Sequence, residues 1–191
     1  MKKLIKLKKL IKTYNLDGYL VPKNDEYFNE YVKKSSDRLK FISNFSGSAG
    51  FAIILKNKNY LFVDGRYTIQ SKIESGKNFK IITVPQKYPR DVLKSKKKIK
   101  IGFDPKLHNE KQLKFLFDAK NITLKAINKN LIDVIWLKKP KDLIKPFFSL
   151  LKKDAGEGSQ EKIKKIKNVL LKKKVDYLLV TAPENVAWIL N

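Results

Sequence analysis

Short apolar segments alternate with amphipathic helical patterns along most of this chain, and the alternation limits the folds open to it. In residues 2–13, leucines and isoleucines recur near a helical period with lysines between them. A turn at 15–18 and a buried strand at 19–21 follow. The pattern therefore predicts a helix packed on a sheet. A basic helix lying on an anionic membrane is the alternative, and the strand that follows so closely disfavours it.

The same alternation continues to residue 127. Phe51–Leu55 and Tyr60–Val63 form apolar runs separated by a tight connection, as in an antiparallel hairpin. Other connections are long enough to carry crossover helices, so the sequence predicts an α/β domain in which helices flank a mixed β-sheet. Further strands are expected at 80–84, 100–103 and 123–127, and helices at 37–41, 67–75, 90–94 and 109–119.

A change of character after residue 137 indicates a domain boundary. Proline and glycine are spread among charges there, and an amphipathic helix follows in which Ile163, Ile166, Val169 and Leu170 share a face. Two segments, one on each side of this boundary, suggest the same order of a helix, a turn, an Asp, a buried strand and an acidic segment. They are LKKLIKTYNLDGYLVPKNDE and IKNVLLKKKVDYLLVTAPEN. We expect a first domain at 1–140, a linker at 141–158, and at 159–191 the truncated start of a second, similar domain with a strand at 177–180.

The composition narrows the classes of function. The net charge of +25 suggests an anionic partner, but only Arg38, Arg66 and Arg90 are arginine among the 43 basic residues. Surfaces that read bases or clamp phosphates favour arginine, so solvated lysine faces are the preferred interpretation. No cysteine is present, and no apolar run reaches the roughly 18 residues of a membrane span. These features favour a cytoplasmic protein with neither a disulfide framework nor a thiolate metal site.

Several residues are of types found in catalytic or binding sites, but a structural role explains their presence better. Gly47-Ser48-Ala49-Gly50 lacks the Lys-Ser/Thr pair of a phosphate loop and precedes a strand, so it predicts a turn. Asp64 and Asp104 follow strands and precede turn residues, which predicts helix capping. His108 is the only histidine, and we expect it to be a surface or capping residue.

Several motifs together resemble a known family. Three motifs follow one another between Leu20 and Gln70, namely VPKNDEYFNEYV, SSDRLKFISNFSGSAG and LFVDGRYTIQ. Three more come later in the chain, namely KIGFDPKLH, NLIDVIW and PENVAWILN. This order is similar to that of the three-domain cytosolic Xaa-Pro aminopeptidases (aminopeptidase P, peptidase family M24), which begin with a creatinase-type N-terminal domain. The resemblance implies that a second domain and a metal-bearing catalytic domain would continue beyond Asn191.

The resemblance also implies a function. The family removes an N-terminal residue that precedes proline from short peptides, using two divalent metal ions, manganese or zinc, held in the third domain. In this chain we expect no metal site and no catalytic residue. We expect a role in shaping access to the active site and in supporting a homo-oligomer. Tyr27, Arg38 and Arg66 are the candidates for the lip of that cleft, although the family usually has a histidine where this chain has Tyr27.

Two other functions remain open at this point. The same fold occurs in catalytically silent relatives that bind peptides or proteins, and this chain could be such a module. A lysine-rich nucleic-acid binder is the third hypothesis; we expect it to bind duplex DNA weakly, without sequence selectivity and with strong salt dependence. Whether a longer protein with the metal ligands exists separates the first two hypotheses.

Overall fold

The structure, a computed structural model, describes residues 2–191. The chain divides into two compact units. The first comprises the residues up to Glu26 and Glu30–Asp142, and the second comprises Tyr27–Asn29 and Leu143–Asn191. Each unit is described by itself.

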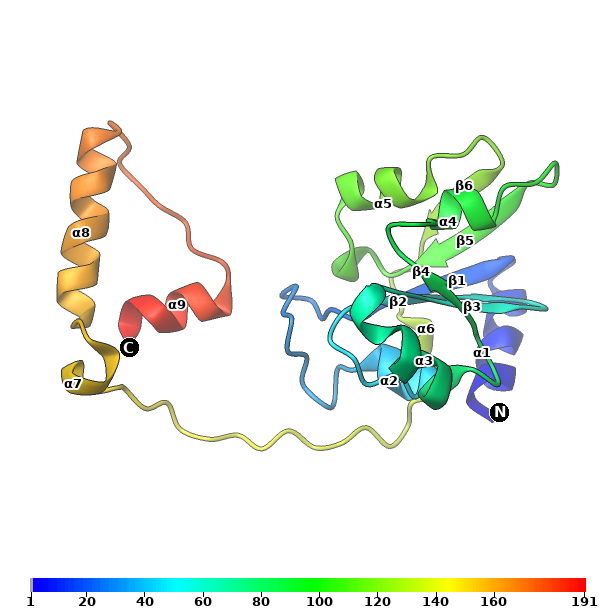
Figure 1. Ribbon diagram of the computed structural model, residues 1–191, viewed down its shortest axis with the longest axis horizontal. Helices are drawn as coiled ribbons and strands as arrows, with labels where there is room; N and C mark the ends of the chain where they lie inside the picture. The colour runs from blue at the N-terminus through cyan, green and yellow to red at the C-terminus, as the bar shows by residue number, and fades with distance from the viewer. Residues whose placement is uncertain (1) are drawn as a thin grey trace. The chain divides into compact units, whose positions relative to one another are not determined.

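A six-stranded mixed sheet forms the centre of the first unit, in the order β4-β3-β2-β1-β5-β6 (Figure 1). Strand β2 runs antiparallel to both of its neighbours, whereas the pairs β3–β4, β1–β5 and β5–β6 are parallel. Five strands therefore point the same way and end at the same edge. The predicted mixed sheet and hairpin are confirmed. The strands are β1 (Gly18–Pro22), β2 (Phe51–Leu55), β3 (Asn59–Val63), β4 (Lys80–Thr83), β5 (Ile99–Phe103) and β6 (Ile122–Ala126).

Helices cover both faces of this sheet. One face carries α1 (Lys2–Thr13), α2 (Arg38–Ser43), α3 (Thr68–Ser75) and α6 (Leu131–Ile135) (Figure 1). The other face carries α4 (Pro89–Val92) and α5 (Glu110–Phe117) (Figure 1). The helices expected from the sequence are all present, and α6 is an additional short one.

Two hydrophobic cores lie on the two faces, and β1 supplies both. Tyr19 and Val21 belong to one core and Leu20 to the other, as the two-residue period of a strand requires. On α1, Leu7 and Ile11 are fully buried in the first core. Ile5, which the pattern also placed near the apolar face, is 51% exposed, because only one narrow side of the helix touches the sheet.

The turn before β2 is fixed by Gly50. Its φ is +155°, and a Cβ at this position would lie 2.8 Å from the carbonyl oxygen of Phe62. A side chain here would have to displace backbone, so the glycine serves the turn and no phosphate loop forms. The predicted caps are also confirmed, because Asp37 accepts a hydrogen bond from the Lys40 N–H and Asp64 accepts one from the Arg66 N–H. The helix after Asp64 begins with a 3₁₀ turn (Gly65–Tyr67) that precedes α3.

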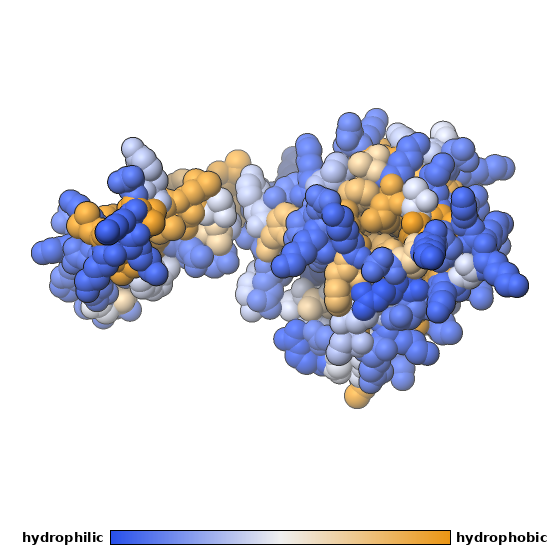
Figure 2. Space-filling view, turned by 90° about the horizontal axis from the view of Figure 1, so that it is seen from above, coloured by the Kyte–Doolittle hydropathy of each residue, from blue (hydrophilic) through white to orange (hydrophobic). Residues whose placement is uncertain are grey.

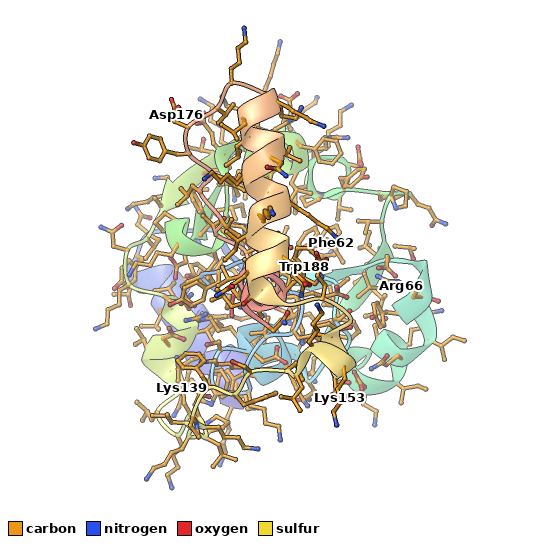
Figure 3. All side chains as sticks on the ribbon, turned by 90° about the vertical axis from the view of Figure 1, so that its left-hand side faces the viewer. Phe62, Arg66, Lys139, Lys153, Asp176 and Trp188 are labelled. Atoms are coloured by element: carbon orange, nitrogen blue, oxygen red, sulfur yellow. The ribbon has the colours of Figure 1, made fainter. Side chains whose placement is uncertain are left out.

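The second unit contains α7 (Lys152–Ala155), α8 (Ser159–Lys172) and α9 (Pro183–Leu190). Helix α8 is the predicted amphipathic helix, and Trp188 of α9 lies beside its first turn with Lys162 Nζ 4.5 Å from the indole centroid (Figure 3). The strand expected at 177–180 is wrong. No strand forms among residues 143–191, so this segment has no partner for its backbone groups within its own unit.

Large apolar side chains of the second unit remain exposed. Tyr177 and Leu179 are 89% and 87% exposed, and Trp188 is 59% exposed. Hydrophobic surface is visible on this unit in Figure 2. A segment that buries so little apolar area gains little stability from folding.

We therefore expect residues 174–182 to exchange their amide protons fastest, and α8 to exchange faster than β1 or β5. The reason is that the extended segment has no ladder hydrogen bonds and α8 packs on little else. Hydrogen exchange measured on a sample whose mass is checked by size exclusion tests this. Strong protection throughout 159–191 in a strict monomer would contradict it.

Candidate functional site

Buried polar residues gather at the edge of the sheet where β1 and β5 end. Most of the buried charged or polar side chains of the first unit lie on the loops that leave this edge or on the helices those loops lead into. The carboxyl ends of parallel strands are where α/β sheets commonly place their functional groups. The members are Lys23, Asp25, Asp37, Arg38, Asp104, His108 and Asn130.

Arg38 lies at the centre of this polar edge. Its Nε and Nη2 donate to the two carboxylate oxygens of Asp133, both at 2.9 Å, and Nη2 also donates to Glu26 Oε1 at 2.7 Å. The Arg38 side chain is only 5% exposed. This guanidinium therefore joins the β1–α2 loop, α2 and α6, which are far apart in the sequence.

The electrostatics of this group favour the ionised forms. Burial opposes the charge on Asp133, but hydrogen bonds from Arg38 and Lys139 outweigh burial and hold the Asp133 pKa below its ordinary value. Burial likewise opposes the charge on Arg38, and its two carboxylate partners raise its pKa. One guanidinium nitrogen, Nη1, is buried without a hydrogen-bond partner within residues 2–191. The Arg38–Asp133 pair is thus held in its ionised form, which suits it to fixing the loop in place.

A second ion pair closes the same loop. Lys23 Nζ lies 2.7 Å from Asp37 Oδ2, with both side chains about nine-tenths buried, and Asp37 also caps α2. Asn24 donates to the carbonyl oxygen of Leu107 at 2.9 Å. The loop between β1 and α2 is consequently fixed at both of its ends. Between these ends lie the exposed aromatic side chains of Tyr27, Phe28 and Tyr31.

The neighbouring loops are fixed by capping side chains. Asn130 donates to Asp104 Oδ2 at 2.8 Å and accepts from the N–H of Ile132, which starts α6 and thereby places Asp133 opposite Arg38. Asp104 accepts from the N–H of Lys106. The capping role expected for Asp104 is confirmed.

The three residues predicted for the cleft lip have different surroundings. Tyr27 lies in the β1–α2 loop and is 71% exposed, whereas Arg38 is buried and engaged with carboxylates. Arg66 follows β3 at the same edge of the sheet and projects near the start of α3 (Figure 3), where it pairs with the Asp64 carboxylate at 2.7 Å. Arg66 and Arg38 pair with different carboxylates, so no shared partner joins them. Their part in a lip stays a prediction.

Sequence reasoning missed Asp133 and Asn130 as members of this site. Both lie in NLIDVIW, where a five-residue helix gives too short a periodic signal to orient a side chain.

His108 is buried, so the expected surface position is wrong, whereas the alternative capping role is met, because His108 occupies the C-cap position of the 3₁₀ turn Pro105–Leu107. Its ring lies edge-on to Phe103, with the centroids 5.9 Å apart, and it is 8% exposed. Burial lowers its pKa to about 4, although nearby Asp104 acts in the opposite direction. The residue follows the 3₁₀ turn Pro105–Leu107 at its C-terminal end, where its ring packs against β5.

Replacing Arg38 by alanine is expected to reduce the free energy of unfolding by about 2–3 kcal/mol. The loss is smaller than for a fully buried pair because Glu26 and Asp133 are about a third exposed and Lys139 still faces Asp133. The matched control is Arg66→Ala, which removes an exposed pair and should change stability little. Urea denaturation of both variants measures this, and equal losses would contradict the assigned role of Arg38.

The folded protein should lose stability as the pH falls from about 6.5 toward 4, because the depressed His108 pKa means that the unfolded chain binds the proton more tightly. The loss attributable to this residue is up to about 3 kcal/mol. This loss of stability should be absent in His108→Phe. Because the chain has no other histidine, the difference between the two proteins reports on His108 alone. Denaturation at a series of pH values decides this; parallel curves for the two proteins would rule it out.

No group of three or more His, Asp or Glu side chains within residues 2–191 is arranged to hold a metal ion. Among residues 2–191, no helix is both long enough and apolar enough to cross a bilayer.

Comparison with known proteins matches one type of domain and one group of enzymes along the whole chain. The family described as the creatinase/prolidase N-terminal domain matches residues 3–142, and a second family of the same description matches residues 138–191. A probable Xaa-Pro aminopeptidase P of Coprinopsis cinerea is 34% identical over 100% of this chain and 32% of its own length. Xaa-Pro aminopeptidase 1 of Dictyostelium discoideum is 33% identical over 100% of this chain and 33% of its own length.

The solved structures agree. The X-prolyl aminopeptidase of Caenorhabditis elegans, described as a cytosolic enzyme with a di-nuclear active site, superimposes with a TM-score of 0.79 at 27% identity, over 98% of this chain and 34% of that one. The N-terminal domain of peptidase PepQ from Mycobacterium tuberculosis shares the fold, with a TM-score of 0.54 at 19% identity over 70% of this chain and 98% of that one. The chain spans 32% of the length of its Coprinopsis relative. Its fold, its motifs and these matches together show that the chain belongs to the creatinase/prolidase N-terminal domain family.

Proposed function

We propose that this chain is the non-catalytic N-terminal portion of a metal-dependent Xaa-Pro aminopeptidase. The observation that carries the proposal is the similarity to enzymes of that name along the entire chain, with 34% identity to the Coprinopsis relative. Because the chain spans 32% of the length of that relative, we place catalysis elsewhere in a longer protein. Two divalent ions, manganese or zinc, would belong to that other part.

Within such an enzyme, we assign the loop between β1 and α2 a role in limiting access to the active site. The β1–α2 loop has the physical properties this role requires. Ion pairs of Lys23 and Arg38 fix its ends, and it carries exposed aromatic side chains between them. A fixed loop loses little conformational entropy when it contacts a substrate or a neighbouring domain.

The three lip candidates take different parts in this proposal. Tyr27 is the contacting residue, because its side chain is largely exposed. Arg38 is a positioning residue that acts through Glu26 and Asp133. Arg66 contributes an exposed charge beside the same edge. Short proline-containing peptides are the proposed substrates, the cytosol the proposed location, and a homo-oligomer the proposed assembly.

A chimaera tests the proposal. Residues 1–191 of this chain replace the matching third of the Dictyostelium enzyme, and kcat/KM is measured for a short and a long Xaa-Pro peptide with manganese present. Tyr27→Ala should change the ratio of the two kcat/KM values by about 3–10-fold, since a lost contact of this size is worth about 1 kcal/mol. The matched control is Ile73→Ala, which removes a side chain that is 80% exposed on α3.

Residues 1–191 alone should show no turnover with or without manganese. Activity of the isolated chain that survives repurification would contradict the non-catalytic assignment. A chimaera whose length preference is the same in the Tyr27 variant and the Ile73 control would contradict the role in access.

A further inference from the structure

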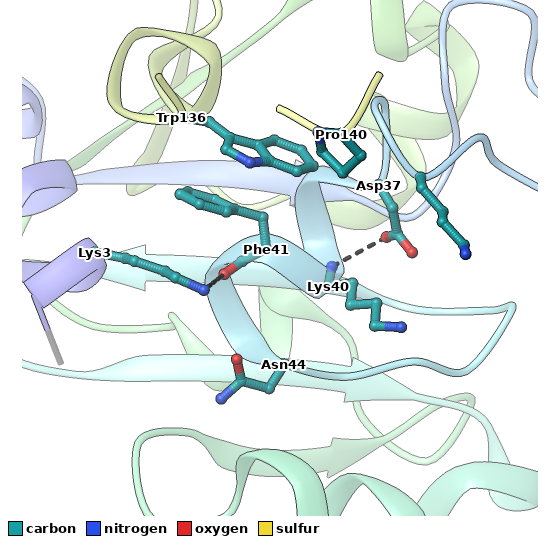
Figure 4. Close-up of a pocket in the computed structure, with 8 residues that line it drawn as sticks. Lys3, Asp37, Lys40, Phe41, Asn44, Trp136 and Pro140 are labelled. Atoms are coloured by element: carbon teal, nitrogen blue, oxygen red, sulfur yellow. Dashed lines mark hydrogen bonds between the residues drawn. The ribbon is translucent and has the colours of Figure 1, made fainter. Parts of the chain in front are cut away.

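A pocket of about 340 Å³ lies beside the polar edge, with which it shares Asp37, and takes no part in the function proposed above. It is bounded by the N-terminal end of α1, the outer side of α2, Trp136 after α6 and the segment that follows (Figure 4). Its volume is within the range that small-molecule sites occupy. The residues that matter for its chemistry are Lys3, Lys34, Asp37, Lys40, Phe41 and Trp136.

The charge around this pocket is positive and largely uncompensated. Three lysines line it against one carboxylate, that of Asp37. Both oxygens of that carboxylate are already engaged, Oδ2 by Lys23 Nζ at 2.7 Å and Oδ1 by the Lys40 N–H at 3.1 Å. Within residues 2–191, neither Lys34 nor Lys40 forms an ion pair. The Asp37 charge is therefore already balanced by Lys23, and Glu74, the other acidic group that interacts electrostatically with Lys40, forms no ion pair with it.

An aromatic wall completes the pocket. The rings of Phe41 and Trp136 stack with their centroids 4.5 Å apart and their planes at 16°. Lys3 Nζ lies 4.5 Å from the Phe41 centroid and donates to the Phe41 carbonyl oxygen at 2.9 Å (Figure 4). Lys139 Nζ lies 5.5 Å from the Trp136 centroid. The stack is held in place between these cations, so the wall exists before any ligand arrives.

We propose that this pocket binds a small organic anion, one that carries a carboxylate or phosphate group on a compact apolar body. The anionic group would lie between the ammonium groups of Lys34 and Lys40, which attract it over the range of a Debye length. The apolar body would contact the ring edges of Phe41 and Trp136, since Lys3 and Lys139 lie over the outer ring faces, and water is released on binding. The ammonium groups reach bulk solvent, so affinity in the micromolar to millimolar range is expected.

Trp136 provides the readout for a test. The chain has two tryptophans, so Trp188→Phe leaves Trp136 as the only fluorophore of its kind and the only indole N–H signal. Benzoate, phenyl phosphate and neutral benzamide are titrated to about 10 mM, above the Kd of weak small-molecule sites. Fluorescence and the ¹H–¹⁵N shift of the Trp136 indole are followed together. Benzoate and phenyl phosphate separate carboxylates from phosphate monoesters as the source of the anion.

We expect saturable shifts with at least one of the two anions and none with benzamide. Affinity should fall at least fivefold in Lys34→Gln/Lys40→Gln and stay unchanged in the control pair Lys87→Gln/Lys129→Gln, which removes the same charge from exposed positions elsewhere. No saturable shift with either anion, equal binding of benzamide, or equal weakening in the control pair would overturn the proposal. None of these readouts depends on peptidase activity.

Discussion

The central place of β1 in the sheet is the constraint on which the rest of the first unit depends. All five of its residues are buried, because helices cover both faces and strands pair with both edges. The chain that leaves β1 therefore starts within the protein interior. A charged group there is tolerated only with a partner. Lys23 meets Asp37 and Arg38 meets Asp133 for this reason, and the loop between them has its ends fixed as a result.

Features that depend on neighbouring residues could be predicted from the sequence. The helix at 2–13, the hairpin around 56–59 and the caps at Asp37 and Asp64 all follow from period, turn chemistry or the reach of one side chain. The strand order could not be predicted in the same way. The order and directions of the strands together show that the loops after β1, β3 and β5 leave a common edge and so bring Arg66 and Asp104 to the side of the sheet where Arg38 lies.

Errors arose where local pattern and tertiary surroundings disagreed. His108 follows a polar turn, which suggests exposure, but the β5–α5 connection folds back against Phe103 and buries the ring. The apolar run at 177–180 has the composition of a strand, and a strand needs a neighbour that residues 143–191 do not supply. Arg38 and Asp133 are separated by 95 positions, so no window of sequence reveals their pairing.

That separation has a consequence for synthesis on the ribosome. Chains emerge at about 5–20 residues per second, so Arg38 precedes Asp133 by about 5–20 s. During that interval the hairpin of β2 and β3 and its pairing with β1 can form, but β5, which pairs with β1 on its other edge, has yet to be made. Two carboxylates pair with Arg38 in the finished fold, and only that of Glu26 has been made by then. The β1–α2 loop is therefore completed late, when the last helix of the first unit arrives.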